Sequence, residues 1–433
     1  MVAHARVTER VPVAYAALMR SLDAIAERGT DDIDLTHPAS QPRVRELADA
    51  LLDSGADTSM LRALGRDPDV GIDVRVATRL AESRRLVADG AIDVGEIVVQ
   101  CAMWGEQRRL RPRDDDNPLG EDALRVKLDQ LDWLLSDTDV AWRLQAIDDG
   151  CPDDSAGVAE RMAADHDLGG RVHVLRLADA VPADTGPLVG LADVDSSRKG
   201  GAMILGAHTA MQAGADAVVL TDADTSVDLG QLGLLLAPFA AGAQVVIGDR
   251  KHADSVLRKA EARWGPGIVV LRHMQRMVGR ALFSRGLHDT QAAFKLYGRG
   301  ALADILAAPS TFGFSFDSDW LYGALRGGHE IAATPFAFVD SFAESASITQ
   351  GPMTTWESLL VGLTASARAR GVDHDEQMAA VVDDYASADV LDVVVQQIPP
   401  QLEGVDPSEL GDPAVLSPAD LRVWLADLEP VIR

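Results

Sequence analysis

The feature that most constrains the fold is a short apolar run that ends in two spaced carboxylates. Residues 217–220 read Ala-Val-Val-Leu, and the turn-like sequence Ala-Gly-Ala-Asp precedes them. An apolar run of this length and β-branched character is typical of a central strand of a parallel sheet. Asp222 and Asp224 follow it directly. Because ligands of open α/β sheets bind beyond the carboxyl ends of the strands, we expect both carboxylates to face a ligand.

The two carboxylates also indicate the kind of ligand. Hard oxygen donors without a nearby Cys or His suit Mg²⁺ or Mn²⁺, and such an ion would hold a diphosphate. Acid pairs of this kind also cap helices and lie in solvated loops, so the pair alone is a weak signal. Its position after an apolar strand favours a metal site made of Asp222 and Asp224.

Composition limits the classes of function. The chain has 433 residues, of which 47% are hydrophobic and 25% charged, and its net charge is −27. A negative charge this large argues against binding to nucleic acid or to anionic membranes. Cys101 and Cys151 form neither a disulfide framework nor a zinc-ligand spacing. We expect a cytoplasmic protein, because the first residues lack the apolar core of a signal peptide and the longest apolar run, 232–248, is interrupted by Pro238 and glycines.

The chain divides into three parts by its pattern. Residues 1–94 have apolar residues at helical spacing and are predicted to form a helical N-terminal extension that serves packing or oligomerisation. Residues 95–350 alternate between strand and helix patterns, whereas residues 351–433 are helical and acidic. The alternation predicts an α/β fold with a doubly wound mixed sheet, flanked by helical N-terminal and C-terminal extensions.

The individual elements follow from runs of β-branched residues and from apolar residues three or four apart. Strands are expected at residues 96–101, 142–147, 172–175, 217–220, 244–248 and 331–339. Helices are expected at residues 13–26, 43–52, 74–87, 124–135, 155–164, 200–213, 300–307 and 321–326. The polar loop 340–355 has the Gly, Ser and Pro content of a lid over a site.

Acidic residues recur where the first strands end. They are Glu106, Asp148, Asp149, Asp222 and Asp224. Since the carboxyl ends of neighbouring parallel strands meet at one edge of a sheet, we expect these side chains to converge. No glycine-rich phosphate loop follows the first strand, which disfavours a P-loop enzyme or a dinucleotide-binding dehydrogenase.

A basic segment interrupts the acidic chain. Residues 250–299 contain eleven Lys and Arg but only three Asp and Glu. Arg272, Arg276 and Arg280 are four residues apart and would line one face of a helix. Two interpretations stay open, a solvated helix face or a site for an anion such as a leaving diphosphate or an acceptor phosphate.

Asp317 and Asp319 stand just before an expected helix and also allow two interpretations. Carboxylates near a helix N-terminus are favoured by the helix dipole. The same two carboxylates could equally be the acid–base groups of a site.

The order of these motifs resembles the family 2 glycosyltransferases of the GT-A fold. The matching segments are 102–106 (AMWGE), 148–153 (DDGCPD), 198–202 (RKGGA), 222–224 (DAD) and 248–250 (GDR). Three later segments resemble the dolichyl-phosphate glucosyltransferase and mannose synthase branch: 289–295 (DTQAAFK), 314–319 (FSFDSD) and 342–348 (FAESASI). The resemblance covers roughly residues 95–350, and the order of the motifs is more specific than any one of them.

This resemblance implies transfer of a sugar from a nucleotide diphosphate donor, such as UDP-glucose or GDP-mannose, with inversion at the anomeric carbon. By position, Glu106 would hold the ribose, and Asp148 or Asp149 would hold the base and ribose. Lys199 would lie near the diphosphate, and Asp222 would contact the sugar.

The resemblance also implies a divalent metal, Mg²⁺ or Mn²⁺, held by Asp222 and Asp224. Such an ion offsets the charge that develops on the leaving nucleotide diphosphate, and Arg250 could assist it.

The acceptor side depends on the acceptor's chemistry. A hydroxyl acceptor needs a carboxylate to take its proton, and Asp317 and Asp319 are the candidates. A phosphate acceptor is already a nucleophile, so the arginines of the basic segment would only position it. The acceptor-binding residues implied are Arg272, Arg276, Arg280, Gln291 and Lys295. We expect a phosphate-bearing acceptor, either a polyprenyl phosphate, which would bring the protein to the inner membrane face, or a soluble phosphorylated or hydroxyl compound.

Departures from the family's pattern keep other functions open. Ala102 and Gly105 stand where the family has Pro and Asn, and Ala292 and Ala293 stand where it has Cys and Gly. One alternative is a sugar-1-phosphate nucleotidyltransferase, although residues 104–107 match its expected Gly- and Arg-rich loop poorly. Another is a non-catalytic module that binds nucleotide sugars. A homo-oligomer formed through the helical extensions is a further expectation.

Overall fold

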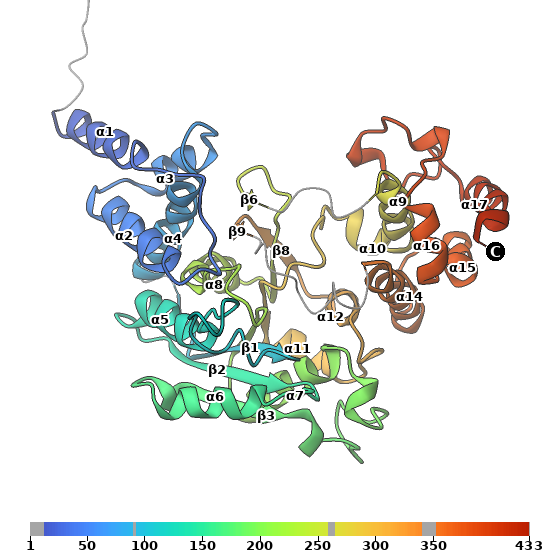
Figure 1. Cartoon of the computed structure of the whole chain (residues 1–433), viewed down its shortest axis with the longest axis horizontal. Helices are drawn as coiled ribbons and strands as arrows, with labels where there is room; N and C mark the ends of the chain where they lie inside the picture. The colour runs from blue at the N-terminus through green and yellow to red at the C-terminus, as the bar shows by residue number, and fades with distance from the viewer. Residues whose placement is uncertain (1–12, 90–91, 259–264, 340–351, 433) are drawn as a thin grey trace, which may run out of the picture.

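The computed structural model describes residues 13–89, 92–258, 265–339 and 352–432. A sheet with helices on both faces occupies the centre, and the helices near the two termini form the two ends of the molecule (Figure 1). The prediction of an α/β fold with a doubly wound mixed sheet and helical regions before and after it is confirmed.

The central sheet has seven strands in the order β3-β2-β1-β4-β7-β5-β8. Strands β1 to β4 run parallel to one another, β7 is antiparallel to both of its neighbours, and β8 pairs in parallel with β5. The strands are β1 (Glu96–Met103), β2 (Ala141–Asp148), β3 (Val172–Arg176), β4 (Ala217–Leu220), β5 (Val245–Gly248), β7 (Lys295–Gly298) and β8 (Ile331–Thr334).

Alternate residues of the strands enter two hydrophobic cores, as the pleat of a strand requires. In β1, Val98 faces a core shared with α7, α11 and α12, whereas Ile97 and Val99 face a core shared with α5, α6 and α8. The covering helices are α5 (Ala123–Leu135), α6 (Ser155–Ala164), α7 (Gly200–Gln212), α8 (Gly233–Ala240), α11 (Arg299–Leu306) and α12 (Phe316–Arg326). Burial on both faces explains why β4 and β5 are apolar throughout.

The N-terminal helical region, residues 13–89, packs against a second, two-stranded sheet. Its helices are α1 (Val13–Ala26), α2 (Ser40–Asp53), α3 (Thr58–Arg66) and α4 (Ile72–Ala88). The small sheet pairs β6 (Val256–Arg258) with β9 (Ala337–Val339) in parallel. Val256, Ala337 and Val339 share one hydrophobic core with these four helices. The N-terminal helices are therefore joined to segments that flank β5 and β8.

The C-terminal helical region, residues 352–432, packs on the opposite end of the molecule against α9 and α12. Its helices are α14 (Pro352–Arg370), α15 (Glu376–Tyr385), α16 (Ala388–Val394) and α17 (Pro418–Ile432), and the helices preceding it are α9 (Ile268–Val278) and α10 (Arg280–Phe283). Short 3₁₀ turns lie at Gly169–Arg171, Leu177–Asp179, Val194–Ser196, Leu229–Gln231, Pro400–Leu402 and Pro407–Glu409. Within the described residues, no helix combines the length and apolarity needed to span a bilayer.

Two expectations differ from the structure, and some elements were not expected. The expected strand 331–339 is two strands, because Pro335, which has no N–H to donate, lies between the end of β8 and the start of β9. Strand β7 and helix α8 were not predicted. The helix expected to carry three arginines on one face ends at Val278, and Arg280 begins α10 after Gly279. Most of the expected lid, residues 340–351, lies outside the described residues.

Candidate active site at the carboxyl edge of the sheet

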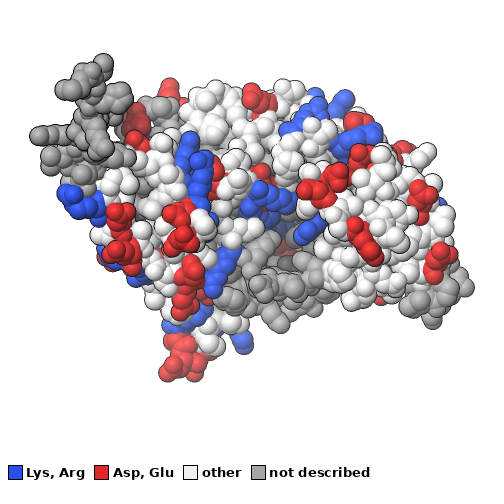
Figure 2. All heavy atoms as spheres, turned by 90° about the horizontal axis from the view of Figure 1, so that it is seen from above, with Lys and Arg blue, Asp and Glu red and all other residues white. Residues whose placement is uncertain are grey.

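Strand register brings the predicted acids to one edge. Met103 at the end of β1 is level with Asp148 at the end of β2, and Gln100 is level with Leu220 at the end of β4. The segments after β1, β2 and β4 therefore leave the sheet side by side. Seen from above, Lys and Arg side chains gather near the middle of the molecule, between its two ends (Figure 2).

Asp222 forms an ion pair with Lys199, whose Nζ donates to Asp222 Oδ1. Lys199 precedes α7 and has a positive φ of 68°, a conformation that non-glycine residues adopt rarely and usually at functional or constrained positions. Burial disfavours the charged lysine, but Asp222 and Asp317 outweigh it and raise the pKa of Lys199 above its usual value. Burial likewise opposes the Asp222 carboxylate, and the charge of Lys199 outweighs it and lowers the pKa of Asp222.

Asp149 holds the Lys199 segment in place. Its Oδ1 accepts from Ser197 Oγ at 2.5 Å and its Oδ2 accepts from the Lys199 backbone N–H at 2.6 Å. Neighbouring Asp148 turns back on the chain, where its Oδ1 accepts from the N–H groups of Gly150 and Cys151, both at 2.9 Å. Both oxygens of the buried Asp149 are thus used within the protein, whereas one oxygen of Asp148 caps a turn.

Glu106, after β1, belongs to a network of three carboxylates around one guanidinium. Arg109 donates to Glu106 Oε2 and, at 2.8 Å, to Glu121 Oε1, and Asp224 lies near enough to influence the pKa of all three groups. Burial, and secondarily the charge of Asp224, raises the pKa of Glu106 to about 7 against the opposing charge of Arg109. Arg109 thus faces three acidic side chains, and Glu106 is partly protonated near neutral pH.

The loop that carries Asp224 is held by buried side chains. Lys127 of α5 donates through Nζ to the Asp224 backbone carbonyl, and Glu121 Oε2 accepts from the N–H of Thr225 at 3.0 Å. Asp224 Oδ1 itself accepts from the Ser226 N–H at 3.1 Å. These contacts hold the backbone around Asp224 and one oxygen of its carboxylate in place.

Asp222 and Asp224 fit a divalent ion that arrives with a phosphate ligand. Among the described residues, no group of three or more His, Cys, Asp or Glu side chains is arranged to hold a metal. Mg²⁺ and Mn²⁺ need only one or two carboxylates when substrate phosphates and water complete their coordination. The Asp222 side chain is 40% exposed, and Lys199 occupies only one of its oxygens.

Two further ion pairs lie near Asp222. Arg250 binds Asp289 in a bidentate manner, with Nε–Oδ2 and Nη2–Oδ1 distances of 2.6 and 2.7 Å. Lys295, fully buried in β7, donates to Asp317 Oδ1 at 2.5 Å. Burial opposes the charge of Arg250, but Asp289, Asp222 and Asp317 raise its pKa. The two cations are thus held in place on the side of the site opposite to Glu106.

The two aspartates of α12 have different surroundings. Asp317 faces Lys295 and lies close enough to Lys199 and Arg250 to affect both of their pKa values. Asp319 points away from the site, because both of its oxygens accept from Arg370 of α14 at 2.8 Å. Gln291 Nε2 contacts the hydroxyls of Thr290 and Ser318, each at 3.3 Å.

The three arginines of the basic segment do not act as one face. Arg280 pairs with Asp373 of the C-terminal helical region, and Arg276 donates to the backbone carbonyls of Pro407 and Leu410. Arg272 is exposed and has no ion-pair partner among the described residues. It lies near Lys251, whose pKa is lowered by burial and by the charges of Arg276, Arg272 and Arg250. We call Lys251, Arg272 and Arg276 the cation cluster.

Several residues of the site were not predicted. Lys127 could have been noticed, because it interrupts the apolar side of the expected helix 124–135. Asp289 lies in a segment that was recognised by resemblance, but its partner Arg250 is 39 residues away, and the sequence does not indicate such a pair. Glu121 and Lys251 left no signal beyond their charge.

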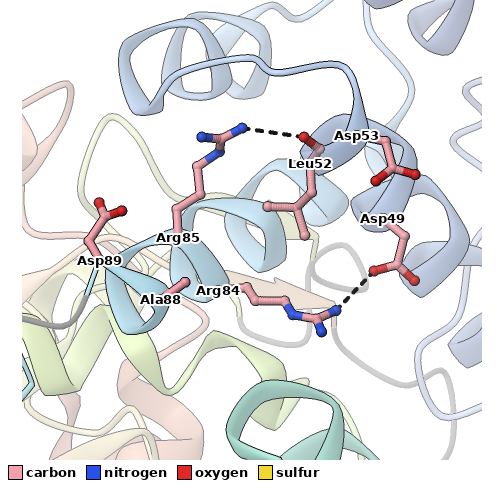
Figure 3. A pocket seen from close by; sticks show the side chains of 7 residues that line it. All are labelled: Asp49, Leu52, Asp53, Arg84, Arg85, Ala88 and Asp89. Carbon is pink, nitrogen blue, oxygen red and sulfur yellow. Dashed lines mark hydrogen bonds and ion pairs between the residues drawn. The ribbon is translucent and has the colours of Figure 1, made fainter. Parts of the chain in front are cut away.

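A surface hollow of about 710 Å³ lies elsewhere, between α2 and α4 (Figure 3). Arg84 pairs there with Asp49 at 3.2 Å, and Arg85 reaches the Leu52 carbonyl at 3.4 Å. The remaining lining residues are Asp53, Ala88 and Asp89. Its arginines contact α2 and its other charged residues are acids, so the carboxyl edge of the sheet is the better candidate site.

Comparison with known proteins shows a partial similarity to a mannose synthase. A polyprenol monophosphomannose synthase from Mycolicibacterium smegmatis is 29% identical over 196 residues, which are 45% of this chain and 65% of that protein. The resemblance to the family 2 glycosyltransferases is confirmed. The chain spans just under two thirds of the length of this relative. No family model matches the sequence.

Solved structures of glucosyl-3-phosphoglycerate synthase from Mycobacterium tuberculosis are also similar in part. One in complex with UDP aligns with a TM-score of 0.43 and 14% identity, over 68% of this chain and 86% of that one. Another, with Mn²⁺, UDP-glucose and phosphoglyceric acid, aligns with a TM-score of 0.43 and 15% identity, over 68% and 85% of the two chains.

Proposed function

We propose that this chain is a metal-dependent, inverting glycosyltransferase that moves a sugar from a nucleotide diphosphate donor to a phosphate-bearing acceptor. The observation that carries the proposal is the meeting of Asp222 with Lys199 and Arg250, and of Asp224 with Lys199, at the carboxyl edge of the sheet. The relative from M. smegmatis, named for making polyprenol monophosphomannose, supports the same class of reaction.

On the donor side, the site contains charge ready for a diphosphate. Lys199 and Arg250 both influence the pKa of Asp222, so both cations lie close to the carboxylate that would contact the donor. Arg250 is oriented by its bidentate bond to Asp289 before any ligand binds, which lowers the reorganisation needed when charge develops on the leaving group. A bound Mg²⁺ or Mn²⁺ would supply further stabilisation of that charge. Asp222 and Asp224 would hold the ion.

On the acceptor side, Asp317 is the better candidate for a base. It faces Lys295, Lys199 and Arg250, whereas both oxygens of the buried Asp319 are bound by Arg370. A hydroxyl acceptor would pass its proton to Asp317. A phosphate acceptor needs no base, and Asp317 would then only fix the position of Lys295.

The cation cluster favours a phosphate-bearing acceptor. Like charges close together repel each other, and this repulsion adds to the larger effect of burial in lowering the pKa of Lys251. An anion bound between Lys251 and Arg272 would relieve this repulsion and form charge-assisted hydrogen bonds. Because Arg280 is occupied by Asp373, we assign it no part in acceptor binding.

The proposal is tested with a panel of UDP- and GDP-sugars in the presence of Mg²⁺ or Mn²⁺. Each donor is combined with a polyprenyl phosphate in vesicles or with a soluble phosphorylated acceptor. Release of nucleoside diphosphate and an inverted anomeric configuration by NMR are expected. Release of pyrophosphate would indicate a nucleotidyltransferase, and binding without turnover would indicate a non-catalytic module. The acceptor that reacts decides whether the protein works at the inner membrane face.

A further inference from the structure

Thr225, the residue after Asp224, connects the candidate metal site to the N-terminal helical region. Its buried hydroxyl lies 3.1 Å from the backbone carbonyl of Leu35 and 3.1 Å from Glu121 Oε2. A hydroxyl carries one hydrogen, so it donates to one of the two acceptors at a time. Leu35 belongs to the stretch between α1 and α2, 190 residues away in the chain.

The Leu35 carbonyl is itself held in place. Gln41 Nε2 donates to it at 2.5 Å, and Gln41 Oε1 accepts from Gln130 Nε2 at 2.8 Å. Gln130 Oε1 in turn accepts from the backbone N–H of Leu229 at 3.0 Å. All of these side chains are buried. The segment 224–229 is therefore attached to the N-terminal helical region near both ends. Thr225 contacts that region directly, and Leu229 is connected to it through Gln130.

The N-terminal helical region also holds the segment that follows β5. Arg66 of α3 binds Asp254 through two hydrogen bonds, and Arg258 of β6 donates to the Ile33 carbonyl at 2.8 Å. Asp254 lies four residues after Arg250. Both segments that carry charged groups into the site thus rest on residues 31–66.

We propose that the N-terminal helical region positions the donor and metal site, and that Thr225 is the positioning residue through which it fixes Asp224. The inference rests on the proposed function of this site. A carboxylate on a short loop binds a metal weakly if the loop samples several conformations, because binding must then select one of them. The contacts of Thr225 restrict the loop before the ligand arrives.

The test compares Thr225→Val with Thr225→Ser. Valine keeps the shape of the side chain and removes the hydroxyl, while the N–H of residue 225 still reaches Glu121 and Gln41 still reaches the Leu35 carbonyl. Serine keeps the hydroxyl. The measurements are the Kd of Mn²⁺ together with UDP or GDP by calorimetry, and amide hydrogen exchange of residues 222–229 without ligand.

We expect Thr225→Val to raise the Kd about tenfold, at the low end of the cost of losing a group behind a metal ligand, and to speed exchange of residues 224–229. Thr225→Ser should restore both. The matched control is Thr78→Val in α4, a buried threonine whose hydroxyl donates only to Arg75 of its own helix, at 2.7 Å. It should lose stability without changing either measurement.

Wild-type affinity and wild-type exchange in Thr225→Val would overturn the inference. If Thr225→Val does not fold, Gln41→Met, which removes the second donor to the Leu35 carbonyl, takes its place with the same expected result. Should the wild-type protein bind neither UDP nor GDP with Mn²⁺, the proposed function fails. The exchange of residues 224–229 without ligand still decides whether Thr225 fixes the loop.

Discussion

Asp319 and Arg370 form a bidentate ion pair that joins α12 of the central domain to the end of α14. The Nε–Oδ1 and Nη2–Oδ2 distances are both 2.8 Å, and the Asp319 side chain has no exposed surface. Ser310 adds hydrogen bonds from its N–H and its hydroxyl to the same carboxylate. Asp319 therefore attaches the C-terminal helical region to the helix that also carries Asp317.

Replacing Arg370 with methionine should destabilise the protein strongly. The change leaves Asp319 buried without its cation, and breaking a buried ion pair in this way typically costs about 3–5 kcal/mol. Urea denaturation followed by circular dichroism measures the loss. The control is Arg368→Met, two residues earlier, where the ion pairs to Glu376 and Asp383 are largely exposed and the loss should be much smaller. Equal losses of stability in the two variants would mean that the buried ion pair contributes no more to stability than the exposed ones.

Local sequence pattern predicted the elements whose periodicity is undisturbed. Residues 13–26, 155–164 and 217–220 form their helix or strand at the expected bounds, because the apolar spacing of the two helices and the β-branching of the strand are undisturbed there. Strand β7 escaped prediction since Lys295 stands at its start, and a lysine argues against a buried strand unless its partner is known. That partner, Asp317, is 22 residues further along the chain.

The site was predicted in its outline and not in its pairings. Strand ends placed Glu106, Asp148 and Asp222 on one edge, because the direction of parallel strands follows from the alternation of strands and helices. The pairing of acids with cations depends on packing between distant segments of the chain, and local sequence patterns do not predict that packing. Asp317 and Asp319 show this, because they are two residues apart in the chain, yet Asp317 pairs with Lys295 and Asp319 pairs with Arg370.

Replacing Arg272 with glutamine should weaken acceptor binding selectively. The other two members of the cation cluster donate to backbone carbonyls, Lys251 to that of His288 and Arg276 to those of the C-terminal helical region, whereas Arg272 is exposed and has no ion-pair partner among the described residues. Loss of a charged hydrogen bond, worth roughly 1.5–3 kcal/mol, should raise the acceptor KM about tenfold or more. The donor KM should stay near the wild-type value in steady-state kinetics.

Arg280→Gln is the matched control for this change, because Arg280 lies on the same basic segment but pairs with Asp373. It should leave both KM values unchanged. A rise in the donor KM of Arg272→Gln as large as that in the acceptor KM would instead assign Arg272 to the diphosphate.

His273 should make the stability of the protein fall at acidic pH. The ring is buried in α9, its Nδ1 accepts from the Gly411 N–H at 3.0 Å, and its Nε2 contacts the Leu416 carbonyl at 2.9 Å. Burial lowers the pKa of His273 below its ordinary value of 6.5. The unfolded chain therefore binds a proton at a higher pH than the folded chain does, so the contribution is present above pH 6.5 and is lost as the pH falls below it.

For each pH unit below the pKa of His273 in the unfolded chain, the free energy of unfolding falls by at most about 1.4 kcal/mol. Free energies of unfolding at several pH values, compared between the wild type and His273→Gln, measure it, because glutamine keeps a donor and an acceptor but does not titrate. The control is His37→Gln, at an exposed position whose Nδ1 accepts from the N–H of Ala39. If the wild type and His273→Gln lose stability in parallel, His273 does not titrate on unfolding.

Replacing Asp224 with asparagine should abolish metal-dependent turnover of the donor while leaving its loop in place. Asparagine keeps an oxygen that can accept from the Ser226 N–H, as Asp224 Oδ1 does at 3.1 Å, and Lys127 still holds the backbone carbonyl. The charge that binds the cation is lost. Since a metal stabilises a developing negative charge by several kcal/mol, kcat/KM should fall by at least about 100-fold.

Nucleoside diphosphate release, titrated with Mn²⁺, is the measurement for Asp224→Asn. Asp137→Asn, whose side chain is 87% exposed, is the control and should behave as the wild type. Full activity of Asp224→Asn at the wild-type Mn²⁺ concentration would remove Asp224 from the metal site and, with it, the reason for assigning a metal to this edge of the sheet.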